Sequence, residues 1–381
     1  MSDQAPVPSP LARVLDALGV GGRDIASIVP LTGGTYNTVT RVTLADGRDW
    51  VVKTPPPHTA ALRYERDLLV NEVAFYTAAA RAGGPAIPRV VRSEADPAAP
   101  TGAYLAMTAR PGRPWHEVAP TADDGDEPRL RGELGRLVGR LHTVTGPGFV
   151  GSGAAGSGSA EPGAAGSRPA GSGAARSRPA GSGFGYPAEP FGPLAPTWRT
   201  AFTAMTEAVF ADAETYRARL PYPADHIRTV LAGAAHVLDE VVRPALVHFD
   251  LWPGNLLVTG EPGARTIGGV VDGERMFWGD PVADFVSLAL FGDIERDRDF
   301  LDGYAEAVGE SVEFTDALRT RYALYRSYLY LIMLVETVPR AVGAEVAYET
   351  WELVAPHLVD ALDAARLGAS VSCRTRPGSD G

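Results

Sequence analysis

The sequence has almost no cysteine and no long apolar run. Its single cysteine, Cys373, lies in a polar C-terminal segment, which excludes a disulfide framework and a cysteine-based metal cluster. The most apolar stretch, residues 328–335, is too short to cross a bilayer, and residues 1–20 lack the pattern of a secretory signal. We therefore expect a soluble protein of the cytoplasm.

Positive charge is also scarce. The 35 Lys and Arg residues and 46 Asp and Glu residues give a formal net charge of −11 at pH 7. Nucleic acids and anionic membranes attract basic faces, so this balance argues against both as partners. It favours a cationic small molecule as a ligand. With 381 residues, 45% of them hydrophobic, the chain is long enough to form two lobes with substantial cores.

Two residue types are so rare that their positions are informative. Lys53 is the only lysine, and asparagine occurs only at Asn37, Asn71 and Asn255. A chain that uses arginine elsewhere retains lysine where a compact ammonium is needed, because the guanidinium group is a wide planar fork. These four positions are therefore candidates for chemistry that the commoner residue types cannot supply.

The hydrophobic pattern divides the chain into a β-rich part and a helical part. In residues 1–108 we predict a short helix at 11–18, a longer one at 60–82, and strands at 25–30, 38–44, 49–54, 89–94 and 103–108. In residues 109–367 we predict short apolar runs at 245–248, 256–258 and 269–271 among helices at 130–143, 198–220, 224–242, 282–291, 300–308 and 315–338. The predicted fold class is α+β, with a small β-rich N-terminal lobe and a larger, mostly helical C-terminal lobe.

Two segments have compositions that cannot build a core. Residues 151–183 consist almost entirely of Gly, Ala, Ser, Pro and Arg and contain the phrase SRPAGSG twice. Residues 368–381 form a polar tail. We expect disorder in both segments. The insertion is interpreted as a tolerated loop expansion rather than a lid, because such a composition supplies reach without recognition.

One short stretch carries the strongest chemical signal. His248, Asp250 and Asn255 form the pattern H-x-D-x-x-x-x-N, and Asp272 follows another apolar run. Phosphoryl transfer to a hydroxyl requires a carboxylate beside the attacking oxygen and oxygen ligands for magnesium at the nucleotide phosphates. The spacing predicts Asp250 as the catalytic base and Asn255 and Asp272 as magnesium ligands. The alternative is that they are ordinary turn and capping residues.

Lys53 completes this pattern. It follows Val51 and Val52 on a predicted strand, and Glu72 lies in the next predicted helix. A strand lysine paired with a helix glutamate is the arrangement with which kinases hold the nucleotide phosphates. Glu65, on the same predicted helix, is a rival partner, but Glu72 is better placed relative to the apolar positions of the helix.

These motifs resemble those of the aminoglycoside phosphotransferase and fructosamine kinase superfamily, whose fold is similar to that of eukaryotic protein kinases. The matching segments are LTGGTYN at 31–37, Lys53, NEV at 71–73, PAIP at 85–88, YLAMT at 104–108, PGRP at 111–114, residues 134–142, HFDLWPGN at 248–255, VDGE at 271–274 and GDPVAD at 279–284.

The resemblance implies a two-lobed kinase-like fold and ATP and magnesium as cofactors. It also implies that Asp250 is the base, that Asn255 and Asp272 bind magnesium, and that Lys53 and Glu72 lie at the phosphates. Adenine is then stacked by the hinge around Met107, and Asn37 braces the nucleotide loop.

Two departures from the family pattern are present. Phe249 stands where family members usually have glycine or arginine, which would reshape the pocket wall without removing the base. The nucleotide loop lacks G-x-G-x-x-G and offers Gly33, Gly34 and Thr35. We expect Thr35 and the backbone near Gly34 to contact the phosphates.

Several other residues are weaker candidates. His248 is expected to bond the backbone rather than shuttle protons, Asp280 to cap a helix, and Asp284 to lie on its face. Glu274 either contacts substrate or orients the catalytic loop. A further set of residues either lines an acceptor pocket or belongs to a buried helix with polar tips, namely Tyr322, Tyr325, Arg326, Tyr328, Tyr330 and Glu336.

Three functions follow as hypotheses. The first is an ATP- and magnesium-dependent phosphotransferase whose acceptor is a hydroxyl of an antibiotic such as an aminoglycoside, an aminosugar or a sugar. The second is a fructosamine-kinase-like enzyme that repairs glycated protein amines, which Trp252 favours and the sequence DGE at 272–274 does not. The third is a non-catalytic nucleotide-binding protein, against which the retention of every chemical residue argues.

Overall fold

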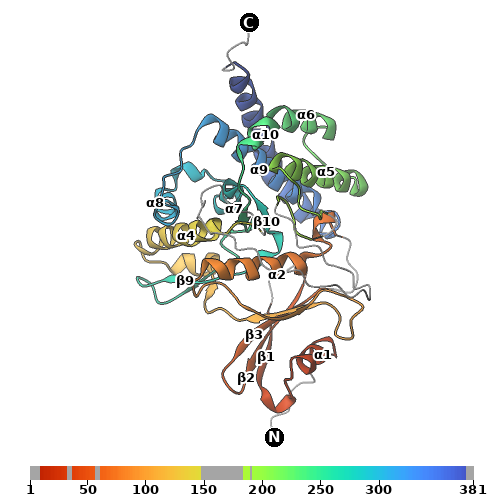
Figure 1. The fold of residues 1–381 in the computed structure, drawn as a ribbon, viewed down its shortest axis with the longest axis vertical. Coiled ribbons are helices and arrows are strands. Elements are labelled where there is room, and N and C mark those ends of the chain that lie inside the picture. Colours follow the sequence, from red (N-terminus) through yellow and green to blue (C-terminus); the bar gives the residue numbers. More distant parts are fainter. Residues whose placement is uncertain (1–8, 32–36, 56–60, 147–182, 189–190, 375–381) are drawn as a thin grey trace, which may run out of the picture.

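The computed structural model describes residues 9–31, 37–55, 61–146, 183–188 and 191–374. Its N-terminal lobe contains a five-stranded antiparallel sheet with the strand order β1-β2-β3-β5-β4. The strands are β1 (Ile25–Leu31), β2 (Thr38–Leu44), β3 (Asp49–Thr54), β4 (Val90–Glu94) and β5 (Tyr104–Thr108). Helices α1 (Ser9–Ala17) and α2 (Leu68–Ala79) complete this lobe, and α2 lies between the sheet and the second lobe (Figure 1).

The alternation of side chains along β3 decides which of them face the second lobe. Trp50 and Val52 are buried in a core beneath α1. Successive strand residues point to opposite faces, so Val51 and Lys53 face the other side of the sheet. Met107 of β5 pairs with Val51 in the ladder and belongs to the main core on that side. The single lysine is thus directed toward the interface between the lobes by strand geometry alone.

The helix predicted at 60–82 is interrupted. A 3-10 helix, η2 (Arg63–Glu65), precedes α2, and Asp67 between them has non-helical backbone angles. The short 3-10 helix η3 (Ala80–Ala82) follows α2 and ends at Gly83, which adopts a positive φ of 72°. Glu65 and Glu72 therefore lie on separate elements, which corrects the expectation that they share one helix.

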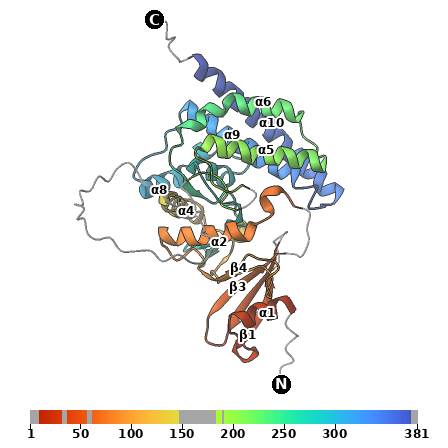
Figure 2. The same cartoon turned by 45° about the vertical axis from the view of Figure 1, so that its right-hand side comes forward.

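The C-terminal lobe is mostly helical, as predicted (Figure 2). Its helices are α3 (Trp115–Val118), α4 (Asp126–Thr143), α5 (Trp198–Tyr216), α6 (Ala224–Ala234), α7 (Asp284–Leu288), α8 (Arg298–Val308), α9 (Asp316–Val335) and α10 (Ala344–Arg374). The short strands β6 (Arg113–Pro114), β8 (Leu256–Thr259) and β9 (Thr266–Val270) form one sheet, and β7 (Ala245–Val247) and β10 (Phe277–Gly279) form another.

Helices α4 and α8 pack side by side at unusually close range (Figure 2). A Cβ atom on Gly135 would lie 2.1 Å from the carbonyl oxygen of Phe300, and one on Gly303 would lie 2.1 Å from that of Gly132. Glycine is therefore required at this crossing, because any side chain would force the helix backbones apart. The crossing brings His142 of α4 to Tyr304 of α8, a contact that supports the catalytic loop described below.

Helix α10 was not predicted from the sequence. Its residues Val354, Leu358 and Leu362 are buried at helical spacing, although Pro356 lies within the helix. It continues to Arg374, so its last residues fall within the segment expected to be a tail. Most of the 151–183 insertion lies outside the described residues. Among the helices that the structure describes, none is sufficiently long and apolar to span a membrane.

Candidate active site

A cleft of about 800 Å³ lies between the lobes. Val39, Val51 and Met107 line it from the N-terminal sheet. Asp250 and Arg275 are among the residues that line it from the C-terminal lobe. The cleft therefore brings together side chains that are about 200 positions apart in sequence.

Lys53 lies at the centre of the charged groups on the sheet side of this cleft. Its Nζ atom donates to Oε1 of Glu72 at 2.7 Å and also pairs with Asp272. The Tyr76 hydroxyl donates to the same oxygen of Glu72 at 3.0 Å. Burial would lower the pKa of Lys53, but the carboxylates of Asp272 and Glu72 outweigh it and hold that pKa well above the usual value. The predicted Lys53–Glu72 pair is present, and the lysine remains charged.

The catalytic loop between β7 and β8 has an unusual backbone at Phe249. This residue has a φ of +64°, a left-handed conformation that is strained for a bulky side chain. Asp284 of α7 accepts hydrogen bonds from the backbone amides of His248 at 3.1 Å and Phe249 at 2.5 Å. The Phe249 ring is fully buried and packs against Phe277, with the two ring centroids 5.1 Å apart. These contacts account for the phenylalanine at a position where a glycine would adopt the same angle without strain.

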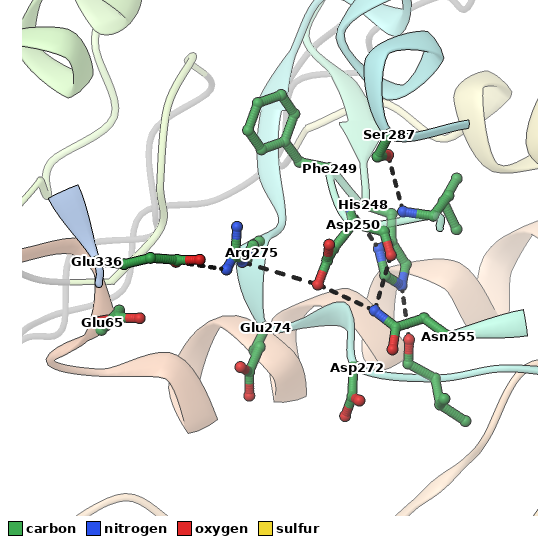
Figure 3. Close-up of polar contacts among 12 residues, drawn as sticks. Glu65, His248, Phe249, Asp250, Asn255, Asp272, Glu274, Arg275, Ser287 and Glu336 are labelled. Carbon is green, nitrogen blue, oxygen red and sulfur yellow. Dashed lines mark hydrogen bonds and ion pairs between the residues drawn. The ribbon is translucent and has the colours of Figure 1, made fainter. Parts of the chain in front are cut away.

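Asp284 is itself held by a buried chain of hydrogen bonds. Nε2 of His142 lies 2.9 Å from its carboxylate, and Nδ1 of the same ring lies 2.9 Å from the Tyr304 hydroxyl. In the same region Ser287 accepts a hydrogen bond from the Leu251 amide at 2.9 Å, as Figure 3 shows. Asp284 was expected to lie on a helix face. It supports the loop that carries Asp250.

Asp250 is fixed by its neighbours in this loop (Figure 3). Nδ2 of Asn255 donates to the Asp250 backbone oxygen at 2.9 Å and to its Oδ2 at 3.0 Å. The Asp250 amide lies 3.2 Å from Nδ1 of His248, whose Nε2 lies 3.0 Å from the Val271 oxygen. Burial lowers the pKa of His248, so the imidazole is neutral, accepts at Nδ1 and donates at Nε2. His248 thus bonds the backbone, as expected.

Asn255 and Asp272 have the donor atoms that magnesium prefers. Because its Nδ2 is engaged by Asp250, Asn255 has its amide oxygen left to ligate a cation. Asp272 has a φ of +58° and its side chain is 40% exposed. Burial would raise its pKa, but Lys53 lowers it below the usual value, so it is a carboxylate at neutral pH. In the described part of the chain there is no cluster of three His, Cys, Asp or Glu side chains that would hold a metal. Two protein oxygens fit magnesium, which binds mainly through a few carboxylates, water and substrate phosphates.

Two further predicted residues, Asn37 and Met107, lie at the same cleft. Asn37 donates from Nδ2 to Oε2 of Glu274 at 3.1 Å, which links the end of the nucleotide loop to the C-terminal lobe. Burial raises the pKa of Glu274 to about 8. Met107 lines the cleft on the sheet side. Gly34 and Thr35 lie outside the described residues.

A second charged cluster, on the far side of Asp250, was not predicted as a unit. Nη2 of Arg275 lies 3.0 Å from Oε2 of Glu336, and its Nε lies 3.8 Å from Oδ2 of Asp250. Arg340 contacts Glu336 at 3.1 Å and Glu65 at 2.6 Å. We call Glu65, Arg275, Glu336 and Arg340 the arginine cluster. It connects η2 of the N-terminal lobe to Asp250. The charged partner of Glu65 in this cluster is Arg340 rather than Lys53.

The residues predicted to line an acceptor pocket or to belong to a buried helix show features of both. They are Tyr322, Tyr325, Arg326, Tyr328, Tyr330 and Glu336. The tyrosines at 322, 325, 328 and 330 are buried, which agrees with a buried helix. The Tyr325 hydroxyl donates to Asp280 at 2.8 Å, and Asp280 caps the following turn by accepting from the Val282 amide at 3.1 Å. Of the set, Glu336 alone is among the described residues that line the cleft. Leu329 and Met333 of α9 line the cleft as well.

The chain matches a family model and several solved structures. A model of the phosphotransferase enzyme family matches residues 27–325. A candidate fructosamine-3-kinase from Thermobifida fusca YX-ER1 superimposes with a TM-score of 0.59 at 22% identity, covering 96% of this chain and 100% of that chain. A candidate aminoglycoside phosphotransferase from Ralstonia eutropha JMP134 gives a TM-score of 0.59 at 13% identity, covering 94% and 98%.

A third structure contains bound ligands. The aminoglycoside phosphotransferase APH(4)-Ia, in a complex with ADP and hygromycin B, gives a TM-score of 0.53 at 15% identity, covering 92% of this chain and 97% of that chain. No curated protein sequence matches the chain significantly. The structural likeness confirms the predicted two-lobed kinase-like fold.

Proposed function

The chain belongs to the phosphotransferase enzyme family, and we propose that it transfers the γ-phosphate of ATP to a hydroxyl group of a small molecule. The observation that carries this proposal is the position of Asp250. It lies in the cleft with one carboxylate oxygen bonded to Asn255, while Lys53, Glu72 and Asp272 form a charged group in the same cleft. Phosphoryl transfer requires a base and a phosphate-binding group placed in this way.

Each residue has a distinct part in this reaction. Lys53, held by Glu72, presents a fixed positive charge to the nucleotide phosphates. Asn255 and Asp272 would hold magnesium, which would offset the negative charge of the phosphates. Asp250 accepts a hydrogen bond from the acceptor hydroxyl and takes its proton as the hydroxyl oxygen bonds to the γ-phosphorus and the bond from that phosphorus to the departing ADP breaks. The buried support from Asp284 keeps the loop in place, so the base needs no rearrangement before the reaction.

A fructosamine-kinase-like activity is a second candidate. Trp252 lies two residues after Asp250, its side chain is 39% exposed, and it stacks on His116 with ring centroids 5.6 Å apart. An exposed aromatic ring beside the base suits the stacking of a sugar ring. The similarity to a candidate fructosamine-3-kinase fits this alternative, although identity of 22% supports only the fold.

The proposal is tested by a coupled assay for ADP release with ATP and magnesium. The acceptors are aminoglycosides, other antibiotics, aminosugars, sugars and a fructosyl-lysine peptide, and the Asp250→Asn variant is the blank. We expect at least one acceptor to give ADP and a phosphate ester detectable by ³¹P NMR, and the variant to lose both signals. Transfer to the peptide alone would favour the second candidate. Nucleotide binding without transfer to any acceptor would contradict the proposal and favour a non-catalytic role.

A further inference from the structure

The carboxylates of the cleft decide which charges an acceptor can carry. An ammonium group that leaves water needs an unengaged carboxylate or several hydrogen-bond acceptors, because burying an unpaired charge is costly. A compound with several ammonium groups therefore needs several such carboxylates. Five acidic residues line the cleft in the part of the chain that the structure describes, namely Glu117, Asp250, Asp272, Glu274 and Glu336.

Each of these five residues already has a hydrogen-bond or ion-pair partner in the protein. Glu117 pairs with Arg113 at 3.1 Å, and Asp272 pairs with Lys53. Oε2 of Glu274 accepts from Asn37 at 3.1 Å. Glu336 contacts both Arg275 and Arg340. The fifth residue, Asp250, is the proposed base and is reserved for the reacting hydroxyl.

In the arginine cluster beside Asp250, each carboxylate contacts a guanidinium group. The same oxygen of Glu336 contacts Arg275 at 3.0 Å and Arg340 at 3.1 Å, and Arg340 also contacts Glu65 at 2.6 Å. Two guanidinium groups thus face two carboxylates. Figure 3 shows Glu336, Arg275 and Asp250 in a row, so Arg275 lies directly beside the base. A cation placed here meets the positive charge of an arginine before it meets an unengaged carboxylate.

Apolar side chains of the C-terminal lobe line part of the cleft. They include Leu290, Leu329 and Met333, together with the partly exposed ring of Trp252, and the polar residues Ser287 and His116 line it as well. Apolar walls with a few polar groups are typical of sites for uncharged ligands, and a flat aromatic ring stacks on the apolar face of a sugar or another ring.

We infer that the acceptor is an uncharged hydroxyl compound with an apolar face, and that compounds with several ammonium groups are disfavoured. This inference rests on the proposed function and specifies its substrate class. It differs from the expectation drawn from net charge. A charge of −11 attracts cations at long range, but the contacts inside the cleft determine which compound stays bound.

The test uses acceptors that differ only in charge or in apolar surface. Kanamycin is compared with fully N-acetylated kanamycin, glucosamine with N-acetylglucosamine, and glucose with phenyl β-glucoside. For each pair, kcat/KM for ADP release is measured, and binding is measured by calorimetry in the presence of magnesium and a non-hydrolysable ATP analogue. We expect N-acetylation to raise kcat/KM or affinity by at least about tenfold, and the phenyl group to raise it by a similar factor.

The Arg340→Gln variant tests whether the arginine cluster causes the preference for uncharged acceptors. It removes the guanidinium group that contacts both Glu65 and Glu336, and Glu336 keeps its contact with Arg275. We expect the ratio of kcat/KM, or of affinity, for the cationic member over the uncharged member of each pair to rise about tenfold. This ratio does not depend on the fraction of folded protein. Arg296→Gln, an exposed arginine paired with Asp293, serves as the matched control and should leave the ratio unchanged.

The outcomes separate this inference from the proposed function. Tighter binding or faster transfer with kanamycin than with its N-acetylated form would overturn the inference while supporting the phosphotransferase. Failure of every uncharged compound to bind or react would overturn it as well. If no compound releases ADP, the proposed function fails, and the calorimetric ranking of the pairs still decides between an uncharged and a cationic ligand.

Discussion

The two sides of the cleft balance charge in different ways. On the nucleotide side, the single ammonium of Lys53 faces the carboxylates of Glu72 and Asp272, so negative charge is in excess before any ligand binds. On the acceptor side, Glu336 and Glu65 each contact a guanidinium group of Arg275 or Arg340. The proposed function places magnesium on the first side and no metal on the second. On this proposal, catalytic chemistry and acceptor choice belong to separate groups of residues that meet at Asp250.

The two sides also differ in how they are held. The Lys53–Glu72 pair joins β3 to α2, which are close in sequence, and Asp272 of the C-terminal lobe adds a contact between the lobes. The arginine cluster joins residues as far apart as Glu65 and Arg340 and crosses between the lobes. Variants on the nucleotide side should therefore affect all acceptors alike, and variants in the arginine cluster should change the preference among acceptors.

The largest effect is expected for the Asp250→Asn variant. It removes the base and keeps a side chain of the same size, so turnover should fall at least about 10²-fold while nucleotide affinity stays nearly unchanged. Steady-state turnover and calorimetric binding of an ATP analogue measure the two quantities. Near-normal turnover would contradict the role assigned to Asp250.

A smaller effect is expected for Lys53→Arg. The charge is kept, but the planar guanidinium group is too wide for a side chain that is only 4% exposed between two carboxylates. We expect KM for ATP to rise about tenfold, with every acceptor affected by the same factor. Arg48→Lys, which exchanges the same two residue types at an exposed position in the turn between β2 and β3, is the control. A change in acceptor preference with Lys53→Arg would contradict the proposed separation of nucleotide binding from acceptor choice.

Asp284→Ala tests the support of the catalytic loop. The change leaves the amides of His248 and Phe249 without their buried acceptor, and an unsatisfied buried donor costs about 1–3 kcal/mol. Turnover should fall several-fold for all acceptors, and the free energy of unfolding should fall by about that amount. Denaturant unfolding and turnover are measured on the same preparation. Unchanged stability would show that Asp284 does not hold the strained backbone at Phe249.

The smallest effect is expected from deleting residues 151–182. Their composition supplies no recognition, and lengthening or shortening a flexible loop changes closure entropy little. Stability and turnover should stay within about twofold of the intact protein, as measured by thermal unfolding and ADP release. A large loss of turnover would show that this segment acts in catalysis in addition to the two sides of the cleft.

The sequence was sufficient to predict the two-lobed fold and the Lys53–Glu72 pair. Lys53, Asp250, Asn255 and Asp272 follow short patterns whose spacing is set by strands and tight loops, and the structure brings these four residues to one cleft. The pairing of Arg340 with Glu65 could not be predicted, because the two residues lie 275 positions apart and the pairing leaves no local pattern. The break at Asp67 was missed for a related reason, since the apolar pattern of the helix continues across it.

The backbone conformation of the site could not be predicted from the sequence either. The presence of Phe249 was noted as a departure, but its left-handed φ and its support by Asp284 depend on the buried surroundings of α4, α7 and α8. Helix α10 was overlooked because Pro356 and many charged residues interrupt its apolar pattern. The spacing of residues in the sequence predicts which side chains are candidates for the chemistry. The contacts that support these side chains can be found only in the folded structure.

The most direct measurement follows the label from γ-³²P-ATP with the intact protein and with Asp250→Asn. For the intact protein with an uncharged hydroxyl compound, the account predicts that label appears in a phosphate ester of the acceptor. For the variant it predicts at least about 10²-fold less label, with nucleotide still bound. Label released only as inorganic phosphate, or transferred equally well by the variant, would contradict the account.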